Sequence, residues 1–322
     1  MNILICSAGR RVSLVRAFQK ELKEAFGKGI VCTTDAEPML SSACHVSDKS
    51  FRVPSFGHMD YINALLKICE SNAISLLIPT HDAQLQVLAQ NHLRFKNLGV
   101  QVLLSTLDFV EKCRDKRLIH KFFEKKGINV AKEYAKDDYK LPMFIKPSDG
   151  TRSIDTFLVK KKEELQDRHF ANPKMMFLEY LDHDLYEEYT CDLYYDKNHQ
   201  LRCAVPRKRI QVREGEVNKG VTCKNALVDE IKLHLKEVKG GIGCLTAQFF
   251  KHKTEEKIYG IEINPRFGGG FPLSYLSGAN FPKWIIQEYL MGEALEDKFD
   301  SWEDNLLMLR YDDEILVHGY QG

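Results

Sequence analysis

The sequence predicts a protein in two parts, a parallel α/β domain over the first ~105 residues and a larger α+β part built mainly from antiparallel strands. Two observations predict this division. Strand-like and helical segments alternate from the N-terminus to Ser105, whereas short strand-like runs separated by turns follow the helical segment that begins near Thr106. The 322 residues are enough for two or three packed domains.

The first part begins with a strand, a tight turn and a helix. Residues 2–6 (NILIC) form a short apolar run, SAGRR follows as a turn of small and cationic residues, and residues 12–26 carry apolar side chains at helical spacing. The alternation continues with a strand at 29–35, a helix at 61–72, a strand at 74–82, a helix at 83–95 and a strand at 100–105. This pattern predicts a Rossmann-like domain, a parallel sheet with helices on both faces.

The second part begins with a helix predicted over residues 107–128, which Gly127 would end as a C-terminal cap. Strand-like runs then follow at 142–147, 175–181, 187–196, 245–250 and 257–264. No repeat, low-complexity segment or Pro/Ser-rich linker interrupts the chain. We therefore expect an α+β unit that continues rigidly from the first domain.

Composition excludes several classes of function. The 46 basic and 45 acidic residues leave a formal charge of +1, so neither nucleic acid nor a membrane surface is expected as a partner. The nine cysteines are scattered and contain no CxxC pair, which favours free thiols over disulfides or a zinc site. No apolar stretch approaches the ~18 residues of a membrane span, and no signal peptide is recognisable, so we expect a cytoplasmic protein.

A predicted hairpin carries the strongest chemical signal. The polar turn KTEEK, centred near Glu255, would place Gln248 directly opposite Glu262, since both lie seven residues from that centre. Side chains alternate along a strand, so Glu262 and Asn264 share one face, while Ile261 and Ile263 point to the other. One face therefore presents a carboxylate and two amide groups.

These ligands are all oxygen atoms, which suits Mg²⁺ or Mn²⁺ and not zinc. Mg²⁺ usually keeps positions for phosphate oxygens, so a nucleotide is the expected companion. Arg266 follows on the same face and could hold a phosphate or a carboxylate through paired hydrogen bonds. For the Glu-Ile-Asn triplet alone, the alternative is the polar outer face of an ordinary hairpin.

The order of several short motifs resembles the ATP-grasp superfamily. These motifs are RDK, FIKP, LEYL, Gln248 and then EINPRFGGG at 262–270. The chain is most similar to stand-alone proteins related to the large subunit of carbamoyl-phosphate synthase, and MNILICSAGRRVSLV, LLIPTHDAQL and VPRKRIQVREGEVNKGVT extend the resemblance over its length. It implies a pre-ATP-grasp domain at 1–107, followed by an ATP-grasp fold with an N-subdomain at 108–183 and a C-subdomain at 184–322 that carries metal and catalytic residues.

The resemblance also implies the ATP-binding residues. Lys116 and Lys146 match two lysines that reach the phosphates, although most lysines are solvated surface charges. Backbone groups of the loop SDGTRS, which includes Ser153, would close over the phosphates. Glycine-richer relatives differ from this loop, so its closing motion stays open. The resemblance assigns adenine to Glu179, Tyr180 and Leu181, in a segment that also reads as a buried strand, and the ribose to Glu188, with Glu187 as the alternative.

Substrate binding is expected at the carboxyl ends of the first strands. Gly9, Arg10 and Arg11 lie at a helix N-terminus, which favours a carboxylate or phosphate. His81 and Asp82 follow another strand, where a helix cap by Asp82 and a turn histidine are the equal alternative.

Arginines at even spacing, Arg207, Arg209 and Arg213, would line one face of a strand. There they would serve catalysis or substrate binding, or they would form an exposed basic sheet face. We expect Arg207 to be catalytic and Arg209 to bind substrate.

Together with the oxygen-ligand set, which favours Mg²⁺ or Mn²⁺, the resemblance implies an ATP-dependent carboxylate-amine ligase. A substrate carboxylate would become an acyl phosphate, and an amine would capture it with release of ADP and phosphate. Arg266, Arg207 and Lys146 are the expected catalytic residues. The alternatives are carbamoyl-phosphate formation from bicarbonate and ammonia, and a nucleotide-regulated binding module without catalysis. The expected partners are small molecules, with a homodimer as an option.

Overall fold

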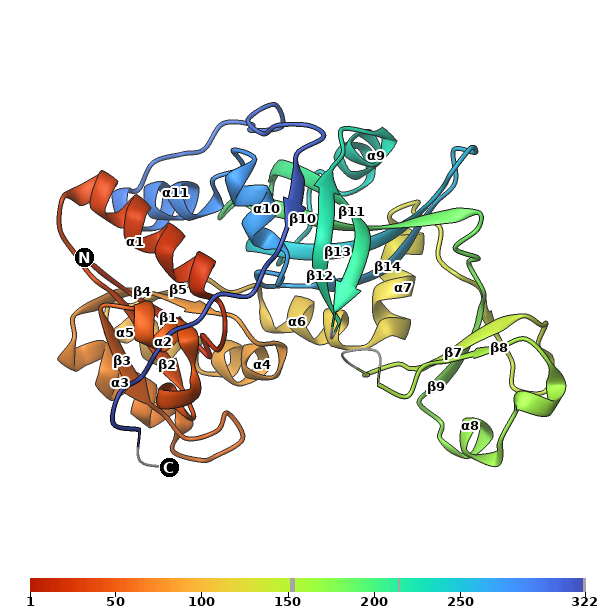
Figure 1. Ribbon diagram of the computed structural model, residues 1–322, viewed down its shortest axis with the longest axis horizontal. Coiled ribbons are helices and arrows are strands. Elements are labelled where there is room, and N and C mark those ends of the chain that lie inside the picture. Colours follow the sequence, from red (N-terminus) through yellow and green to blue (C-terminus); the bar gives the residue numbers. More distant parts are fainter. Residues whose placement is uncertain (151–153, 214, 321–322) are drawn as a thin grey trace.

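The structure of the protein is a computed structural model, and it describes residues 1–150, 154–213 and 215–320. The chain forms three sheets, one in the N-terminal part and two in the rest (Figure 1). Helices α6 and α7 lie between the N-terminal sheet and the small sheet at the far end of the molecule.

The N-terminal sheet has five parallel strands in the order β3-β2-β1-β4-β5. Its strands are β1 (Asn2–Cys6), β2 (Val31–Asp35), β3 (Lys49–Arg52), β4 (Ile74–Pro79) and β5 (Gln101–Val102). The helices of this part are α1 (Val12–Phe26), η1 (Pro38–Leu40), α2 (Ser42–Val46), α3 (Tyr61–Ser71), α4 (Asp82–Gln90) and α5 (His92–Asn97). The strand predicted at 100–105 is therefore much shorter, and α2 and β3 had no counterpart in the prediction.

Helices cover both faces of this sheet, as the alternating pattern predicts. Ile3 and Ile5 of β1 share a core cluster with Phe18 of α1, whereas Leu4 of the same strand packs with Leu65 of α3. Successive side chains of β1 thus face opposite helix layers. Because both faces of the strand are covered, four consecutive positions, Ile3 to Cys6, are buried and apolar.

The helix predicted over 107–128 is wrong as a single helix. It divides into α6 (Leu107–Arg114) and α7 (Lys116–Lys125) at Asp115, whose backbone is extended (φ −104°, ψ 116°). The Asp115 carboxylate accepts a hydrogen bond from the Arg117 backbone N–H and so caps α7. Gly127 follows α7 with φ +82°, which agrees with its predicted role in ending the helix.

A four-stranded antiparallel sheet has the order β6-β9-β7-β8. It consists of β6 (Glu133–Tyr134), β7 (Met143–Pro147), β8 (Phe157–Val159) and β9 (Met175–Glu179), and η2 (Lys162–Glu164) and α8 (Asp167–Ala171) connect β8 to β9.

A six-stranded antiparallel sheet has the order β14-β13-β10-β11-β12-β15. Its strands are β10 (Tyr186–Tyr195), β11 (Leu201–Arg213), β12 (Glu216–Thr222), β13 (Gly243–His252), β14 (Ile258–Asn264) and β15 (Leu307–Leu309). The helices around it are α9 (Ala226–His234), α10 (Phe271–Leu276), α11 (Phe281–Ile286) and the π-helical turn η3 (Gln287–Met291).

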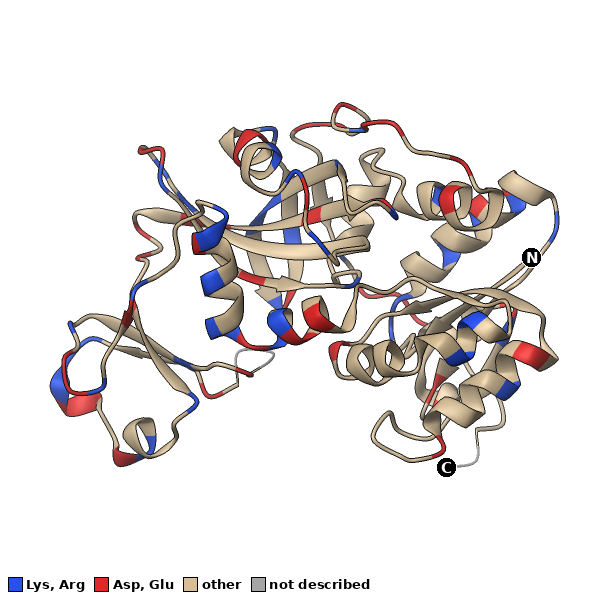
Figure 2. Cartoon of the chain, turned by 180° about the vertical axis from the view of Figure 1, so that it is seen from behind, with Lys and Arg blue, Asp and Glu red and all other residues tan. Residues whose placement is uncertain are grey.

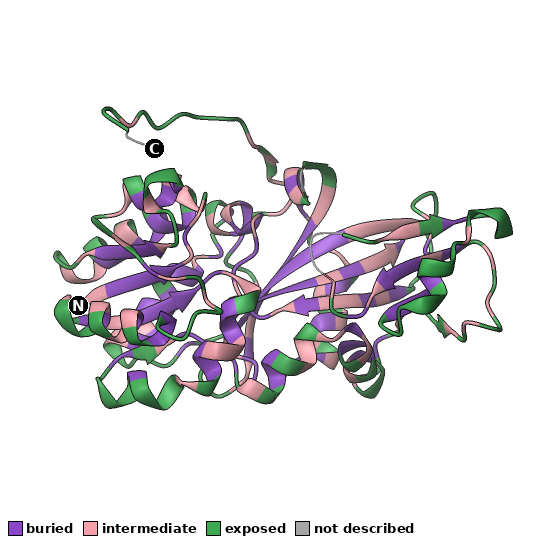
Figure 3. Cartoon of the chain, turned by 90° about the horizontal axis from the view of Figure 1, so that it is seen from below, coloured by how far each residue is buried: buried purple, intermediate pink, exposed green. Residues whose placement is uncertain are grey.

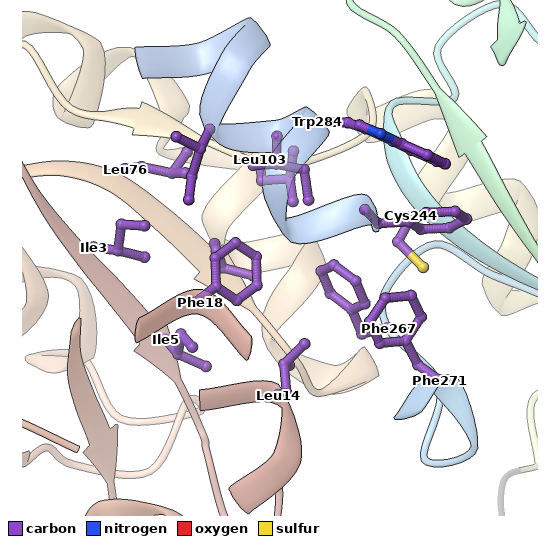
Figure 4. Close-up of a cluster of buried hydrophobic side chains, with 14 of the residues drawn as sticks. Ile3, Ile5, Leu14, Phe18, Leu76, Leu103, Cys244, Phe267, Phe271 and Trp284 are labelled. Atoms are coloured by element: carbon purple, nitrogen blue, oxygen red, sulfur yellow. The ribbon is translucent and has the colours of Figure 1, made fainter. Parts of the chain in front are cut away.

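One core cluster joins the N-terminal sheet to the six-stranded sheet. Phe18 of α1 meets Phe267 edge to face at 6.0 Å between ring centroids, and Phe267 packs in turn against Phe271 of α10 (Figure 4). The two sheets therefore share apolar side chains instead of being connected by a linker alone. The proposed domain boundaries near residues 107 and 183 stay a prediction.

Burial follows these layers. The strands are mostly buried, while the segment that follows β15 is largely exposed and returns to the N-terminal part (Figures 1 and 3). Within the described ranges, no helix is long and apolar enough to cross a membrane.

Candidate functional site

One face of the six-stranded sheet gathers polar side chains from four neighbouring strands. Directly opposite residues of antiparallel strands share a face. The register pairs Thr190 with Arg207 and with Gln248, and Gln248 with Glu262. We call the resulting set the polar sheet face; its members are Glu188, Thr190, Asp192, Arg207, Arg209, Thr246, Gln248, Glu262 and Asn264.

The predicted pair of Gln248 and Glu262 is confirmed, but a bulge produces it. Near the turn, Lys251 lies opposite Ile258, and continuing that register by three residues would place Gln248 opposite Ile261. An irregularity between Gln248 and Phe249 adds one residue to β14 and brings Glu262 into place.

The same bulge corrects one detail of the prediction, because Ile261 and Ile263 do not share a core cluster. Ile263 packs in the cluster that contains Ala247, whereas Ile261 packs with Phe250.

Gln248, Glu262 and Asn264, the predicted metal ligands, lie together at the edge of this face. The Asn264 side-chain amide donates a hydrogen bond of 3.0 Å to Glu262 Oε1. Glu262 is the only carboxylate in this set of three, so the set alone carries one negative charge. Oxygen ligands with one charge suit a magnesium ion that also binds phosphate oxygens, because Mg²⁺ rarely relies on protein ligands alone.

Two lysines approach Glu262 from different elements. Lys116, the first residue of α7, places Nζ 3.7 Å from Glu262 Oε2 and donates to the Gly150 carbonyl at 2.5 Å. Lys146 of β7 lies on the same face of the four-stranded sheet as Met176 and Leu178 of the neighbouring strand β9. Both lysines are buried, with only 9% of the residue surface exposed.

The surroundings of Lys146 disfavour its charge. Burial and the Lys116 cation lower the pKa of Lys146 to about 8, although the carboxylates of Glu262 and Glu188 oppose the shift. A buried ammonium group with a lowered pKa is poorly compensated by the protein itself. It is therefore well suited to an anionic ligand.

His120 lies near Lys116, Lys146 and Glu262, and it was not predicted as a site residue from the sequence. It lies one helical turn after Lys116, and this spacing of four residues is the signal that could have found it. Burial, Lys146 and Lys116 lower the pKa of His120 to about 4, so the ring is neutral at pH 7. Its Nε2 is buried and has no hydrogen-bond partner within the described part of the chain.

The segment Glu179, Tyr180 and Leu181, the predicted adenine site, connects the small sheet to the large one. Glu179 ends β9, and its backbone N–H donates to the Lys132 carbonyl at 2.8 Å. Leu181 belongs to an apolar cluster that the two sheets form between them, together with Met176, Leu178, Phe250 and Ile261. This apolar cluster lies beside the polar sheet face, since Phe250 and Gln248 are on the same strand.

The structure separates the two rival ribose residues. Glu188 belongs to the polar sheet face and accepts a hydrogen bond of 2.5 Å from Arg209. Glu187 points the other way, where Tyr189 and Lys208 donate to its carboxylate. The geometry therefore favours Glu188. Ser153 lies outside the described residues.

Arg207 belongs to the polar sheet face and is almost completely buried. Its Nε donates to Asp192 Oδ2 at 2.9 Å, and the same carboxylate accepts hydrogen bonds from Thr246 and Ser274. Both terminal nitrogens of Arg207 are buried and have no partner among the residues described. Two unpaired cationic donors in a closed space are costly without a further ligand or water.

The glycine run 268–270 lies against side chains of the site. A Cβ atom on Gly270 would come within 2.2 Å of Arg207 Nη1, and one on Gly269 within 2.6 Å of the Glu216 carboxyl carbon. Side chains at these positions would displace charged groups, which explains why glycine is needed there.

Arg266 connects the polar sheet face to helix α4 of the N-terminal part. Its Nη2 donates to Asp82, the first residue of α4, and its Nη1 donates to the Phe267 carbonyl at 3.1 Å. Asp82 thus binds an arginine, and His81 caps α4 instead by accepting from the Ala83 backbone N–H at 3.2 Å. The alternative of a helix cap by Asp82 is therefore wrong.

Hydrogen bonds to the segment 35–43 fix the backbone of the loop after β1. The Gly9 backbone N–H donates to Asp35, and its carbonyl accepts from Ser41 and Ala43. Both backbone groups of Gly9 are thus engaged, which leaves the side chains of Arg10 and Arg11 as the anion-binding candidates of this loop.

The two arginines have different settings. Arg11 donates to the Thr80 carbonyl at 3.0 Å, and burial together with Arg266 lowers its pKa to about 10. Arg10 is more exposed and lies 3.7 Å from Glu216 Oε2.

The predicted row of three arginines does not form. Arg207 and Arg209 share the polar sheet face, but two register irregularities follow Arg209. Arg213 lies near the end of β11 and pairs with Asp312 of the C-terminal segment. Basic and acidic side chains are otherwise distributed over the whole chain (Figure 2).

Two protein families match parts of the sequence. Residues 3–103 match the model of the PylC-like N-terminal domain, and residues 171–308 match that of an ATP-grasp in the biosynthetic pathway with Ter operon. No curated protein matches the sequence.

Solved structures resemble the chain over most of its length. Biotin carboxylase from Campylobacter jejuni, in complex with a β-γ-ATP ligand, has a TM-score of 0.71 at 15% identity and matches 95% of this chain and 74% of its own. The biotin carboxylase domain of the Hydrogenobacter thermophilus 2-oxoglutarate carboxylase, a dimer with MgADP and bicarbonate, has a TM-score of 0.71 at 14% identity, over 95% and 73% of the two chains.

A third example is N5-carboxyaminoimidazole synthetase from Staphylococcus aureus in complex with ADP. Its TM-score is 0.67 at 14% identity, over 92% of this chain and 78% of its own. At identities this low, the structural similarity establishes a common fold and nothing further. The mixed fold predicted from the sequence, a parallel domain followed by an antiparallel ATP-grasp region, is confirmed.

Proposed function

We propose that the protein is an ATP-grasp ligase that uses ATP to activate a substrate carboxylate as an acyl phosphate, which an amine then captures. The match of residues 171–308 to an ATP-grasp family model and the fold shared with ATP-binding ligases support this proposal. The observation that carries this proposal is the convergence of Lys116, Lys146 and Glu262 from α7, β7 and β14 on one polar face. Two cations and an oxygen-ligand set next to an apolar cluster are what a magnesium nucleotide requires.

The residues present fit a magnesium ion and a nucleotide. Among the residues that the structure describes, His120 and Arg207 have buried nitrogens without hydrogen-bond partners, and Lys146 is a buried cation with a lowered pKa. Gln248, Glu262 and Asn264 would hold the metal, which would neutralise phosphate charge and orient the transferring group. The base would enter the cluster around Leu181, and Glu188 would bind the ribose.

In the first step, Lys116 and Lys146 would bind the phosphates and stabilise the negative charge that moves with the γ-phosphoryl group. Arg266, oriented by its bond to Asp82, would hold the attacking carboxylate between the polar sheet face and the N-terminal loop. One carboxylate oxygen bonds to the γ-phosphorus as the bond to the ADP oxygen breaks, so ADP leaves and an acyl phosphate remains.

In the second step, the amine nitrogen attacks the acyl carbon and phosphate leaves, with loss of one proton from the nitrogen. Arg207 would hold the network of Asp192, Thr246 and Ser274 beneath this reaction, and Arg10, Arg11 and Arg209 would bind anionic groups of the substrates. Protein groups mainly position the reactants, because proximity and electrostatics dominate such transfers.

A screen of ADP release tests the proposal. Carboxylic acids, including bicarbonate, would be crossed with ammonia, amines and amino acids in the presence of Mg-ATP, and mass spectrometry would identify any product. ADP release that needs both partners, with a product mass equal to their condensation, is the expected result. Mg-ATP binding without ADP release over the whole panel would contradict a ligase, and carbamoyl phosphate as the only product would identify bicarbonate and ammonia as the substrates.

A further inference from the structure

A small pocket lies where the loop after β1 meets the glycine run 268–270. Its volume is about 30 Å³, which corresponds to roughly two water-sized spheres and therefore to a head group rather than a whole substrate. Four charged side chains line it, and we call it the arginine pocket; they are Arg10, Arg11, Glu216 and Arg310.

These side chains come from three distant parts of the chain. Arg10 and Arg11 belong to the N-terminal loop, Glu216 begins β12, and Arg310 follows β15. Three guanidinium groups against one carboxylate leave an excess of positive charge around a small volume. Such a site favours an oxyanion, because guanidinium groups bind carboxylate or phosphate through two parallel hydrogen bonds.

The Glu216 carboxylate lies where an anionic ligand of Arg10 and Arg310 would bind. Its Oε2 lies 3.2 Å from Arg310 Nη1 and 3.7 Å from Arg10 Nη2, and its carboxyl group rests against the backbone of Gly269. About a third of the Glu216 and Arg310 side chains is exposed, and ion pairs in contact with solvent are weak. The Glu216 carboxylate can therefore give way to a stronger ligand at low cost.

We propose that the arginine pocket binds the oxyanion head group, a carboxylate or a phosphate, of one of the two substrates, and that Glu216 competes with this group for Arg310 and Arg10. The term substrate rests on the proposed function; the anion site itself does not. Arg310 and Glu216 then determine specificity for an anionic substrate, with opposite effects on its affinity.

Calorimetric titration with succinate and with inorganic phosphate tests the pocket, and succinamide serves as the uncharged comparison. We expect Arg310→Gln to weaken binding of the preferred anion by about tenfold. Glu216→Gln should tighten the same binding severalfold, because the competing carboxylate is gone. Arg213→Gln is the matched control, since it removes an arginine that lies outside the pocket, on the β11–β12 hairpin that carries Glu216.

The outcomes separate clearly. Opposite changes in Arg310→Gln and Glu216→Gln, with Arg213→Gln unchanged, would support the proposal, and the tighter of the two anions would identify the head group. No binding of either anion, equal affinities in all variants, or an equal loss in Arg213→Gln would overturn it. Titration of Mg-ADP in parallel keeps the two proposals apart: failure to bind Mg-ADP contradicts the proposed function, whereas the anion titrations decide the pocket.

Discussion

The polar sheet face and the arginine pocket are built in opposite ways. The residues of the polar sheet face lie on neighbouring strands, and backbone hydrogen bonds fix their positions relative to one another. The arginine pocket takes its residues from a loop, a hairpin and the C-terminal segment, and side-chain ion pairs hold them together. Backbone pairing therefore sets the first arrangement, whereas the second depends on side chains that are themselves partly exposed.

This difference suggests separate roles for the two regions: the polar sheet face for phosphoryl transfer and the arginine pocket for substrate specificity. Phosphoryl transfer requires groups held in a fixed geometry, which strands provide. Recognition of a particular substrate can change with a few residues in loops, because these tolerate substitution. Changes on the polar sheet face should therefore affect ATP turnover with every substrate, while changes in the pocket should affect one substrate only.

The largest effect is expected from Glu262→Gln combined with Asn264→Ala. Loss of the metal ligands should lower ADP release by roughly a thousandfold or more with all substrates. Both side chains are partly exposed, so the variant should remain folded, although loss of the Glu262 carboxylate beside Lys116 should lower the thermal unfolding midpoint somewhat. A coupled ADP assay and a thermal melt measure the two quantities, and turnover near that of the wild type would contradict the assignment of the metal ligands.

A second variant, Lys146→Met, should separate activity from stability. ADP release should fall about a hundredfold, because the phosphates lose a buried cation. The pKa of Lys146 is about 8 in the folded protein, below the ordinary lysine value of 10.5. Between these two pH values the unfolded chain binds more protons than the folded one, so the free energy of unfolding of the wild type rises with pH.

At pH 7 the buried charge of Lys146 therefore costs up to about 3 kcal/mol, and Lys146→Met should unfold at a higher temperature than the wild type. The gain should shrink as the pH approaches 10. Thermal melts at both pH values measure it, with the exposed Lys140→Met as the control. A variant less stable than the wild type at pH 7 would show that the Lys146 charge is compensated inside the protein.

Gly270→Ala tests the contact between the glycine run and Arg207. The added methyl group would collide with Arg207 Nη1, and we expect a loss of about 1–3 kcal/mol in the free energy of unfolding together with reduced turnover. Gly57→Ala is the control, because a Cβ there meets nothing within 4 Å. Denaturant titrations compare the two, and equal stabilities would mean that Arg207 moves aside freely.

The smallest effect concerns the metal alone. The wild-type ligand set has one carboxylate, so it should bind Mg²⁺ weakly without a nucleotide. Gln248→Glu adds a second carboxylate and should raise the affinity for free Mn²⁺ by about tenfold. Calorimetry on protein treated with a chelator measures this change. Unchanged affinity would place the metal away from Gln248.

The fold was predictable where periodicity is strong, and the pairing of Gln248 with Glu262 followed from the spacing of the hairpin. The break at Asp115 was missed because the apolar pattern continues across it, while a single side-chain cap decides the backbone. Glu216 and Arg310 could not be foreseen, since 94 residues separate them and no local signal relates them. Contacts that depend on how distant loops pack together cannot be predicted from the spacing of residues along the sequence.

The bulge near Gln248 has a consequence for comparing this chain with distant relatives. A relative without it would carry one residue fewer between the turn and the residue that corresponds to Glu262. An alignment without a gap would then match that acid to Ile261 and hide the common ligand set. At identities of 14–15%, where few other positions anchor an alignment, a one-residue gap between Gly260 and Glu262 decides whether homology at the site is recognised.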